Sequence, residues 1–268
     1  MHLIRNDKKR RHRNASLLYK HMPQTLTPMN TPQLVVFDMA GTTVTDRHEV
    51  EQCFARAAAE TGLTASPERI LAVQGMAKRF VFELLWREQL DPGDPTYPAH
   101  VATSYQRFTE ILEDHYRTQP VTPTVGCLDA FTYLRARGIA IALTTGFYRT
   151  VTDIILDRLG WLDGLDEQRV GTSQTVIQAS LASDEVPQGR PHPDLIRRAM
   201  HLLGITDPTA VVNVGDTPSD LLSGQAAGVG LNLGVTNGTH TAAQLLAHPH
   251  NQLLGSLAEL PDVLTRHS

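Results

Sequence analysis

Short apolar runs recur along the chain, and polar residues directly follow several of them. Short, largely apolar stretches of four or five residues predict buried strands over residues 34–37, 139–143, 211–214 and 229–233. After Pro120 and Pro123, helical spacing of apolar residues predicts helices over 128–137, 150–159, 193–203 and 220–227. Strands that alternate with helices through short links are typical of a parallel sheet with right-handed crossovers.

A second pattern fills residues 48–118, where only helices are expected. They are predicted over 49–61, 66–75, 77–89 and 97–116, and Ser66 followed by Pro67 is a favourable helix start. We therefore expect an α/β protein: a Rossmann-like parallel-sheet core formed by residues 32–47 and 120–268, with an inserted all-helical cap at 48–119. Residues 1–31 are expected to form a flexible basic extension.

Charge is unevenly distributed between the N-terminal segment and the remainder of the chain. The whole chain of 268 residues has a net charge of −4, with 41% hydrophobic and 19% charged residues, which suffices for a core. Residues 1–21 hold seven basic residues and one acidic residue, so the remainder has 17 basic and 27 acidic residues. An acidic body argues against a nucleic-acid partner.

The cysteines and the longest apolar runs indicate in which cellular compartment the protein is expected. Cys53 and Cys127 lack the spacing of a metal or redox pair, so we expect free thiols in a reducing compartment. Apolar runs of four or five residues are far below the roughly 20 residues that span a membrane, and residues 1–31 lack the apolar segment of a secretory signal. We expect a cytoplasmic protein without a membrane partner, although the basic N-terminus also weakly fits a transit peptide.

Candidate chemistry lies where the predicted strands end. Asp38, Thr145 and Asp216 follow strands 34–37, 139–143 and 211–214 closely. The carboxyl ends of parallel strands share one edge, where ligands of such sheets bind. Two carboxylates placed there repel each other unless a cation lies between them, and oxygen ligands without His or Cys favour Mg²⁺.

At this point the sequence resembles a known family. Four segments, in order, resemble the motifs of the haloacid dehalogenase superfamily over about residues 33–240: Asp38-Met39-Ala40-Gly41-Thr42, Thr145-Gly146, Arg190, and Val214-Gly215-Asp216-Thr217 with Ser219-Asp220. Three details resemble its phosphonoacetaldehyde hydrolase branch and the phosphonatase-like relatives. Ala40 replaces the second Asp of common phosphatases, Arg190 replaces the usual Lys, and Gly75-Met76-Ala77-Lys78 is similar to the cap motif whose Lys forms a Schiff base.

The resemblance implies a role for each matched position. Asp38 would attack phosphorus and carry an aspartyl-phosphate, while Lys78 would form an imine with an aldehyde substrate. Arg190 would hold phosphoryl oxygens and the Asp38 carboxylate. The remaining implied roles are substrate binding by Thr42, Thr145 and Gly146, and Mg²⁺ binding by Asp38, the Ala40 carbonyl, Asp216 and Asp220. A homodimer through the cap is also implied.

Elementary chemistry agrees with these substitutions. A phosphonate leaves as carbon, so a proton donor at position 40 has nothing useful to protonate, whereas a protonated imine is an electron sink. The Lys78 amine must be partly neutral to act. Its place on one helix stripe with Val81, Phe82 and Leu85, its position in the first helical turn, and the neighbouring Arg79 should all lower its pKa.

Other interpretations stay open at this stage. The phosphonatase His one turn after the lysine is Val81 here, and Asp194-Leu195 replaces a Trp-Met pair, so the sequence is closer to the phosphonatase-like group. The alternatives are a phosphate-ester hydrolase without the usual general acid and a non-catalytic module that binds a phospho-ligand. Lys78 could also be a solvated surface residue, Arg190 an ordinary loop residue, and Asp216 with Asp220 a helix-capping pair.

Overall fold

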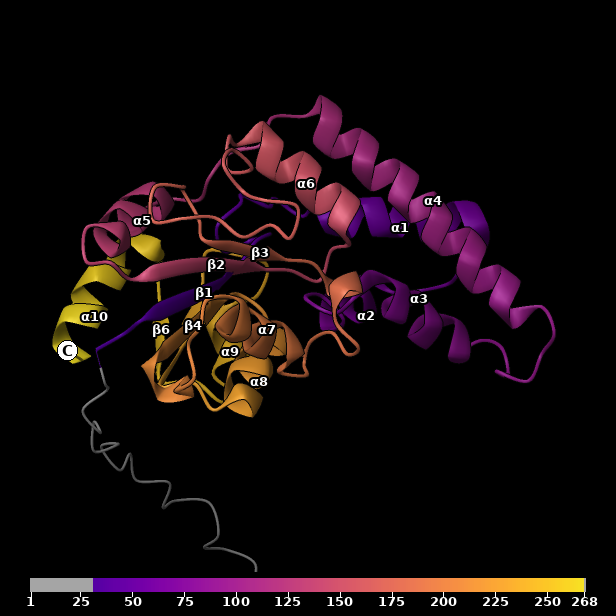
Figure 1. Cartoon of the computed structure of the whole chain (residues 1–268). Coiled ribbons are helices and arrows are strands. Elements are labelled where there is room, and N and C mark those ends of the chain that lie inside the picture. Colours follow the sequence, from indigo (N-terminus) through magenta and orange to yellow (C-terminus); the bar gives the residue numbers. More distant parts are fainter. Residues whose placement is uncertain (1–30, 268) are drawn as a thin grey trace, which may run out of the picture.

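In the computed structural model, residues 31–267 are described; the predicted extension over 1–31 therefore lies, except for Thr31, outside them. Within this range, six parallel strands form one sheet in the order β3-β2-β1-β4-β5-β6 (Figure 1). The strands are β1 (Leu34–Asp38), β2 (Ala140–Thr144), β3 (Ala179–Leu181), β4 (Val211–Gly215), β5 (Leu231–Val235) and β6 (Gln252–Leu254). The expected parallel α/β sheet is confirmed.

Alternation along β1 divides the sheet between two apolar layers. Leu34 and Val36 face one cluster, whereas Val35 and Phe37 face the other, as a period of two requires. The first cluster includes side chains of α7 (Asp194–Leu202) and α8 (Pro218–Ala227). The second includes side chains of α5 (Cys127–Arg135), α6 (Arg149–Arg158) and α10 (Leu260–His267). The short helix α9 (Ala242–Leu245) lies between β5 and β6 in the chain.

Four helices between β1 and α5 form the segment that we call the helical insertion: α1 (Glu49–Thr61), α2 (Pro67–Ala72), α3 (Lys78–Arg87) and α4 (Tyr97–Thr118). Three aromatic rings hold it together. The Phe54 ring lies 4.4 Å from the Phe82 ring and 5.7 Å from the Phe108 ring, and the last two lie 5.6 Å apart. Large buried rings at such separations dominate the packing of a small helical unit.

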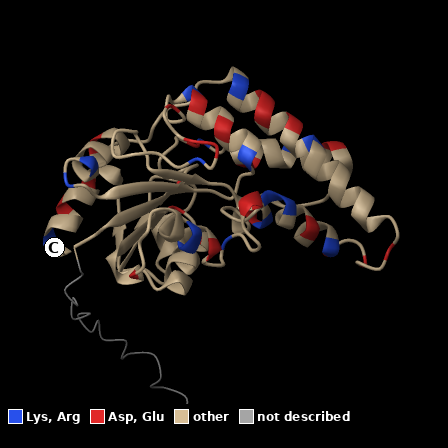
Figure 2. Cartoon of the chain, viewed as in Figure 1, with Lys and Arg blue, Asp and Glu red and all other residues tan. Residues whose placement is uncertain are grey.

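The helical insertion lies against the core along α4 and α6, which run side by side in Figure 1. The Tyr148 hydroxyl donates to Glu113 at 3.0 Å, and Arg158 donates to the carbonyl oxygens of Arg117 at 2.9 Å and Gln119 at 3.2 Å. Acidic and basic residues are mixed along α4 and α6 (Figure 2). These contacts fix one end of the helical insertion to the core, whereas α3 meets the core at its other side.

The structure differs from the expected elements in a few places. The second insertion helix spans only Pro67–Ala72, because the chain turns at Val73 and reaches positive φ at Gly75. The strands β3 and β6 were not expected, since three residues each are too few to show a period. None of the helices formed by residues 31–267 has the length and hydropathy needed to cross a lipid bilayer.

Candidate active site

Three carboxylates meet where the neighbouring strands β1 and β4 end. Asp38 is the last residue of β1, Asp216 directly follows β4, and Asp220 lies in the first turn of α8. Each offers an oxygen that lies within 4.8 Å of the others, and all three are almost fully buried. The strand-end argument thus correctly brought Asp38 and Asp216 together.

Arg190, from the loop before α7, faces two of these carboxylates. Its Nη1 donates to Oδ1 of Asp38 and lies 2.6 Å from Oδ1 of Asp220, while its Nη2 donates to the Thr144 hydroxyl at 2.6 Å. The guanidinium is nearly inaccessible to solvent. The planar fork therefore links the ends of β1, β2 and α8, and the interpretation of Arg190 as an ordinary loop residue is wrong.

Asp216 is held from several directions. Its Oδ1 accepts from the Thr42 hydroxyl at 2.9 Å, and its Oδ2 accepts from the backbone N–H and hydroxyl of Thr239 at 2.7 and 2.8 Å. A Cβ at Gly41 or Gly238 would lie 2.3 Å from Oδ2, so glycine is required on both sides. Thr42, predicted to bind substrate, positions Asp216 here and does not line the cavity described below.

Asp220 caps a helix with one oxygen and directs the other toward the carboxylate cluster. Its Oδ2 accepts from the backbone N–H of Thr217 at 2.9 Å and from the Thr217 hydroxyl at 2.6 Å, and Thr217 caps α8 in return. Its Oδ1 accepts no hydrogen bond, although Arg190 lies in ion-pair distance. One oxygen therefore caps a helix, and the other remains available to a cation.

Without a cation, burial favours the protonated carboxyl groups of this cluster. Burial raises the pKa of Asp38 to about 8, although Arg190 acts in the opposite direction; burial and then Asp220 raise the pKa of Asp216 to about 7. Three buried carboxylates face one guanidinium, an excess of negative charge that a divalent cation would neutralise. The all-oxygen donor set, which includes the Asp220 oxygen that accepts no hydrogen bond, fits Mg²⁺.

Lys78 is buried and faces the same site from the helical insertion. It is the first residue of α3, only 5% exposed, on a stripe with the buried Val81 and Phe82. Its Nζ donates to Oε1 of Gln74 at 3.4 Å and lies 5.6 Å from the centroid of the Phe147 ring. The interpretation of Lys78 as a solvated surface residue is therefore wrong.

Burial is also the main cause of its altered basicity. Desolvation lowers the pKa of Lys78 to about 8, while the carboxylates of Asp38 and Asp46 act to raise that pKa and Arg190 to lower it. The expected contribution of Arg79 is not found, because that side chain is 61% exposed and lies 3.5 Å from Glu83 in an ion pair. The predicted direction agrees and burial is its cause, the contribution of Arg79 is absent, and the influence of the helix start stays a prediction.

A small closed cavity joins the two sides of the site. Its free volume is about 20 Å³, room for roughly one water molecule. The residues that line it come from the core, from the linker before α1 and from the helical insertion: Asp38, Ala40, Asp46, Val50, Gln74, Gly75, Lys78, Thr145, Gly146, Phe147, Thr217 and Thr239. A cavity of this size cannot hold an organic substrate, so we expect the helical insertion to move away from the core before one enters.

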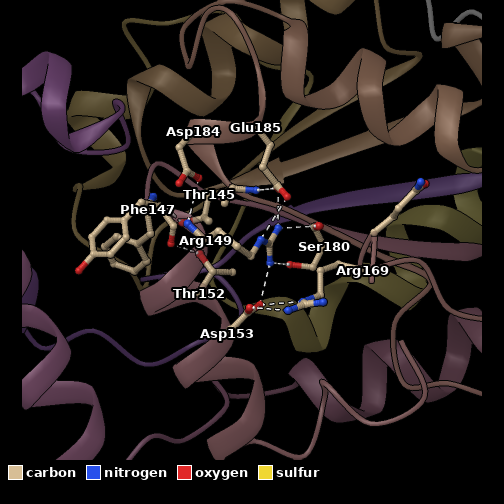
Figure 3. Close-up of polar contacts among 12 residues, drawn as sticks. Thr145, Phe147, Arg149, Thr152, Asp153, Arg169, Ser180, Asp184 and Glu185 are labelled. Atoms are coloured by element: carbon tan, nitrogen blue, oxygen red, sulfur yellow. Dashed lines mark hydrogen bonds and ion pairs between the residues drawn. The ribbon is translucent and has the colours of Figure 1, made fainter. Parts of the chain in front are cut away.

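Thr145 and Gly146 line this cavity on the loop between β2 and α6. Thr145 Oγ1 accepts from the Phe147 N–H at 3.1 Å, which shapes the loop. Figure 3 shows Arg149 beneath it, with Nη2 donating to Glu185 at 2.6 Å and to the Ser180 carbonyl at 2.9 Å. This network connects the loop to the segment after β3, so that the positions of Thr145 and Gly146 depend on an intact core.

Asp46 was missed in the sequence, and one signal that points to Lys78 was left unused. Asp46 lines the cavity, yet no spacing rule singles out an acidic residue in a linker. Lysine usage, by contrast, carries information that simple counting reveals. The chain has four lysines, Lys8, Lys9, Lys20 and Lys78. Among the lysines and arginines after residue 20, all except Lys78 are arginines. The one lysine of residues 31–268 is the buried one in the cavity.

Comparison with known proteins agrees with this geometry. The family model for haloacid dehalogenase-like hydrolases matches residues 32–228. The chain belongs to this hydrolase family. The chain is 29% identical over 251 residues to the phosphonoacetaldehyde hydrolase of Latilactobacillus sakei, covering 88% of this chain and 89% of that one. It is 30% identical over 212 residues to the Pseudomonas fluorescens enzyme of the same name, covering 75% and 71%.

Solved structures support the fold of this haloacid dehalogenase-like hydrolase. A phosphonoacetaldehyde hydrolase-like protein from Oleispira antarctica superimposes with a TM-score of 0.69, covering 90% of this chain and 93% of that one at 15% identity. At that identity the likeness concerns the fold alone.

Proposed function

We propose that this hydrolase cleaves the carbon–phosphorus bond of phosphonoacetaldehyde or a close phosphono-carbonyl compound, in a Mg²⁺-dependent reaction. The observation that carries the proposal is the burial of the Lys78 amine in the same small cavity as the Asp38 carboxylate. An amine and a nucleophile that flank one small molecule suit a substrate with a carbonyl group next to a phosphonyl group.

The steps follow from these two side chains. The neutral Lys78 amine attacks the aldehyde carbon, and loss of water leaves a protonated imine. An Asp38 oxygen then attacks phosphorus; the P–C bond breaks, and its electron pair forms the C=C bond of an enamine as the nitrogen becomes neutral. Water hydrolyses the aspartyl-phosphate, and protonation at carbon followed by hydrolysis releases the aldehyde and frees Lys78.

The surrounding residues support the phosphoryl group. Arg190 keeps one Asp38 oxygen in place and presents a permanent positive charge to the site. Thr145 and the Gly146 backbone line the cavity from the loop after β2, where they can orient phosphoryl oxygens. Mg²⁺, held by Asp38, the Ala40 carbonyl, Asp216 and Asp220, would neutralise charge on the phosphoryl oxygens.

Ala40 also supports the proposal. It lines the cavity at the position where a phosphatase of this superfamily carries its proton donor, and its methyl group cannot protonate a leaving oxygen. A carbon leaving group assisted by an imine needs no such donor at that position. The substitution therefore matches the presence of the buried Lys78.

Release of inorganic phosphate from phosphonoacetaldehyde, with Mg²⁺ present, tests the proposal. We expect turnover that Lys78→Arg abolishes, because the guanidinium cannot form an imine. A panel of small phosphate esters, acetyl phosphate among them, is the comparison. Turnover of the esters that is equal in Lys78→Arg, without any release from the phosphonate, would establish the phosphate-ester hydrolase instead.

A further inference from the structure

Asp46 places a second carboxyl group in the cavity of Lys78. It lies in the linker between β1 and α1, eight residues beyond Asp38, and lines the cavity together with Lys78. After Asp38, Asp46 is the strongest electrostatic influence that raises the pKa of Lys78. Among the described residues that line the cavity, Asp38, Asp46 and Lys78 are the ones with a carboxyl or amino group.

The Asp46 carboxyl group is paired with a second acid. Its Oδ1 accepts from the backbone N–H of Glu49 at 2.8 Å, which places the two carboxyl groups close together. Burial, with the neighbouring Glu49, raises the pKa of Asp46 to about 7, whereas the pKa of Glu49, which burial acts to raise, is lowered by Asp46. The pair as a whole therefore keeps a proton up to about pH 7.

Glu49 faces a different space from Asp46. It lines a hollow of about 620 Å³ between the linker, α1 and α4, together with Arg47, Arg56, Asp114 and His115. The other titratable groups that influence the pair electrostatically are Cys53 on α1 and Tyr116 on α4. The pair thus extends from the closed cavity to a larger hollow on the other side of the linker.

We propose that Asp46 is the proton donor and acceptor for the chemistry at the Lys78 nitrogen, with Glu49 holding it protonated. This inference rests on the proposed imine. In the carbinolamine formed by Lys78 and an aldehyde, the nitrogen lone pair forms the C=N bond as the C–O bond breaks. The departing hydroxyl takes the Asp46 proton and leaves as water. In product release, the Asp46 carboxylate takes that proton back from the attacking water.

The other residues in reach do not fit this step. Asp38 is required as an ionised nucleophile, Ala40 and Val50 have no exchangeable side-chain proton, and the Gln74 amide is not an acid. Asp46 comes from the linker that connects the core and the helical insertion.

Reductive alkylation of Lys78 by acetaldehyde and cyanoborohydride, followed by peptide mapping, tests this assignment in the full chain. The probe contains no phosphorus, so its result is independent of carbon–phosphorus cleavage. At pH 7 we expect Lys78 to be labelled at least roughly tenfold more slowly in Asp46→Asn than in the wild type. Labelling of Lys8, Lys9 and Lys20 in the same sample is the internal reference.

The direction of the change in labelling rate distinguishes proton transfer by Asp46 from a purely electrostatic influence. An Asp46 that acted only through its negative charge would raise the pKa of Lys78, so its loss in Asp46→Asn would give faster labelling. Equal or faster labelling, in a variant with the wild-type melting temperature, overturns the proposal. If Asp46→Asn does not fold, Glu49→Gln serves instead: the rise of labelling with pH should level off at a lower pH, because Asp46 loses its proton earlier, and an unchanged pH profile would refute the assignment.

Discussion

The backbone N–H of Lys78 donates to the carbonyl oxygen of Gly146 at 3.3 Å and joins the helical insertion to the core. A Cβ at Gly146 would lie 2.5 Å from the Met76 carbonyl oxygen and 2.6 Å from that of Gly75. The two backbones therefore meet without space for a side chain between them. Closure of the cavity depends on this contact.

Gly75→Ala should impair closure. The new Cβ would lie 2.4 Å from the Thr217 hydroxyl, so the helical insertion cannot reach its closed position. We expect kcat to fall at least roughly tenfold, because a slight displacement of Lys78 from the substrate is costly. Steady-state kinetics with phosphonoacetaldehyde measures the effect.

Gly62→Ala is the matched control for this variant. Gly62 has a φ of 77° and Gly75 a φ of 81°, but no atom lies within 4 Å of a Cβ at Gly62. Both substitutions therefore carry a similar backbone penalty of about 1 kcal/mol. Equal activity losses in the two variants would contradict the importance of the close approach.

Lys78→Met should abolish activity and stabilise the fold. With a pKa near 8 in place of the ordinary 10.5, charged Lys78 destabilises the folded state at pH 7 by up to about 3 kcal/mol. The unfolded chain binds more protons between these two values, so this penalty disappears as the pH rises from 8 to 10.5. Urea unfolding of both proteins at pH 7 and pH 10 should show the gap narrowing. A constant gap would contradict the lowered pKa.

The pH dependence of imine formation should have two limbs. The rate should rise tenfold per pH unit up to about 7, as Lys78 loses its proton, stay level while Asp46 loses its own, and fall above about 8, where neutral Lys78 no longer increases. A maximum between pH 7 and 8 is expected in single-turnover experiments. Asp46→Asn should lose the alkaline limb; a profile with an identical alkaline limb in that variant would argue against its assignment.

Mg²⁺ should stabilise the protein through the three carboxylates. Binding to the folded state raises the melting temperature, since it relieves repulsion among Asp38, Asp216 and Asp220. Asp216→Asn should reduce this shift strongly, while Asp194→Asn, a half-buried acid on α7, should retain it. Equal shifts in the two variants would place the cation elsewhere.

Arg190→Lys should reduce activity strongly, although the substitution keeps the positive charge. A single ammonium cannot bind Asp38 and Thr144 at once as the fork does. We expect kcat/KM to fall roughly a hundredfold, with Arg198→Lys on the exposed face of α7 as the control. If Arg190→Lys keeps wild-type kcat/KM, the bidentate role is incorrect.

The sequence predicted most of the core because strand-end positions are strongly constrained. Asp38 and Asp216 were placed together because each follows the carboxyl end of a parallel strand, and the helical stripe correctly buried Lys78. Thr42 shows the limit of this reasoning. Its hydroxyl can reach either a phosphoryl group or Asp216, and only the three-dimensional path of the Gly41 turn decides for Asp216.

The parts that could not be predicted depend on contacts between distant segments. Thr239 reaches Asp216 across 23 residues, and Asp46 enters the cavity because a linker turns inward. Neither leaves a periodic pattern in the sequence. The exposure of Arg79 likewise follows from the rotation of α3, which directs it to Glu83 rather than to Lys78.

Borohydride reduction in the presence of phosphonoacetaldehyde and Mg²⁺, followed by peptide mapping, tests the central claim most directly. We predict a two-carbon adduct on Lys78, formed faster than any adduct on Lys8, Lys9 or Lys20, with simultaneous loss of activity. Phosphate release that continues undiminished under reduction, with Lys78 unmodified, would contradict it.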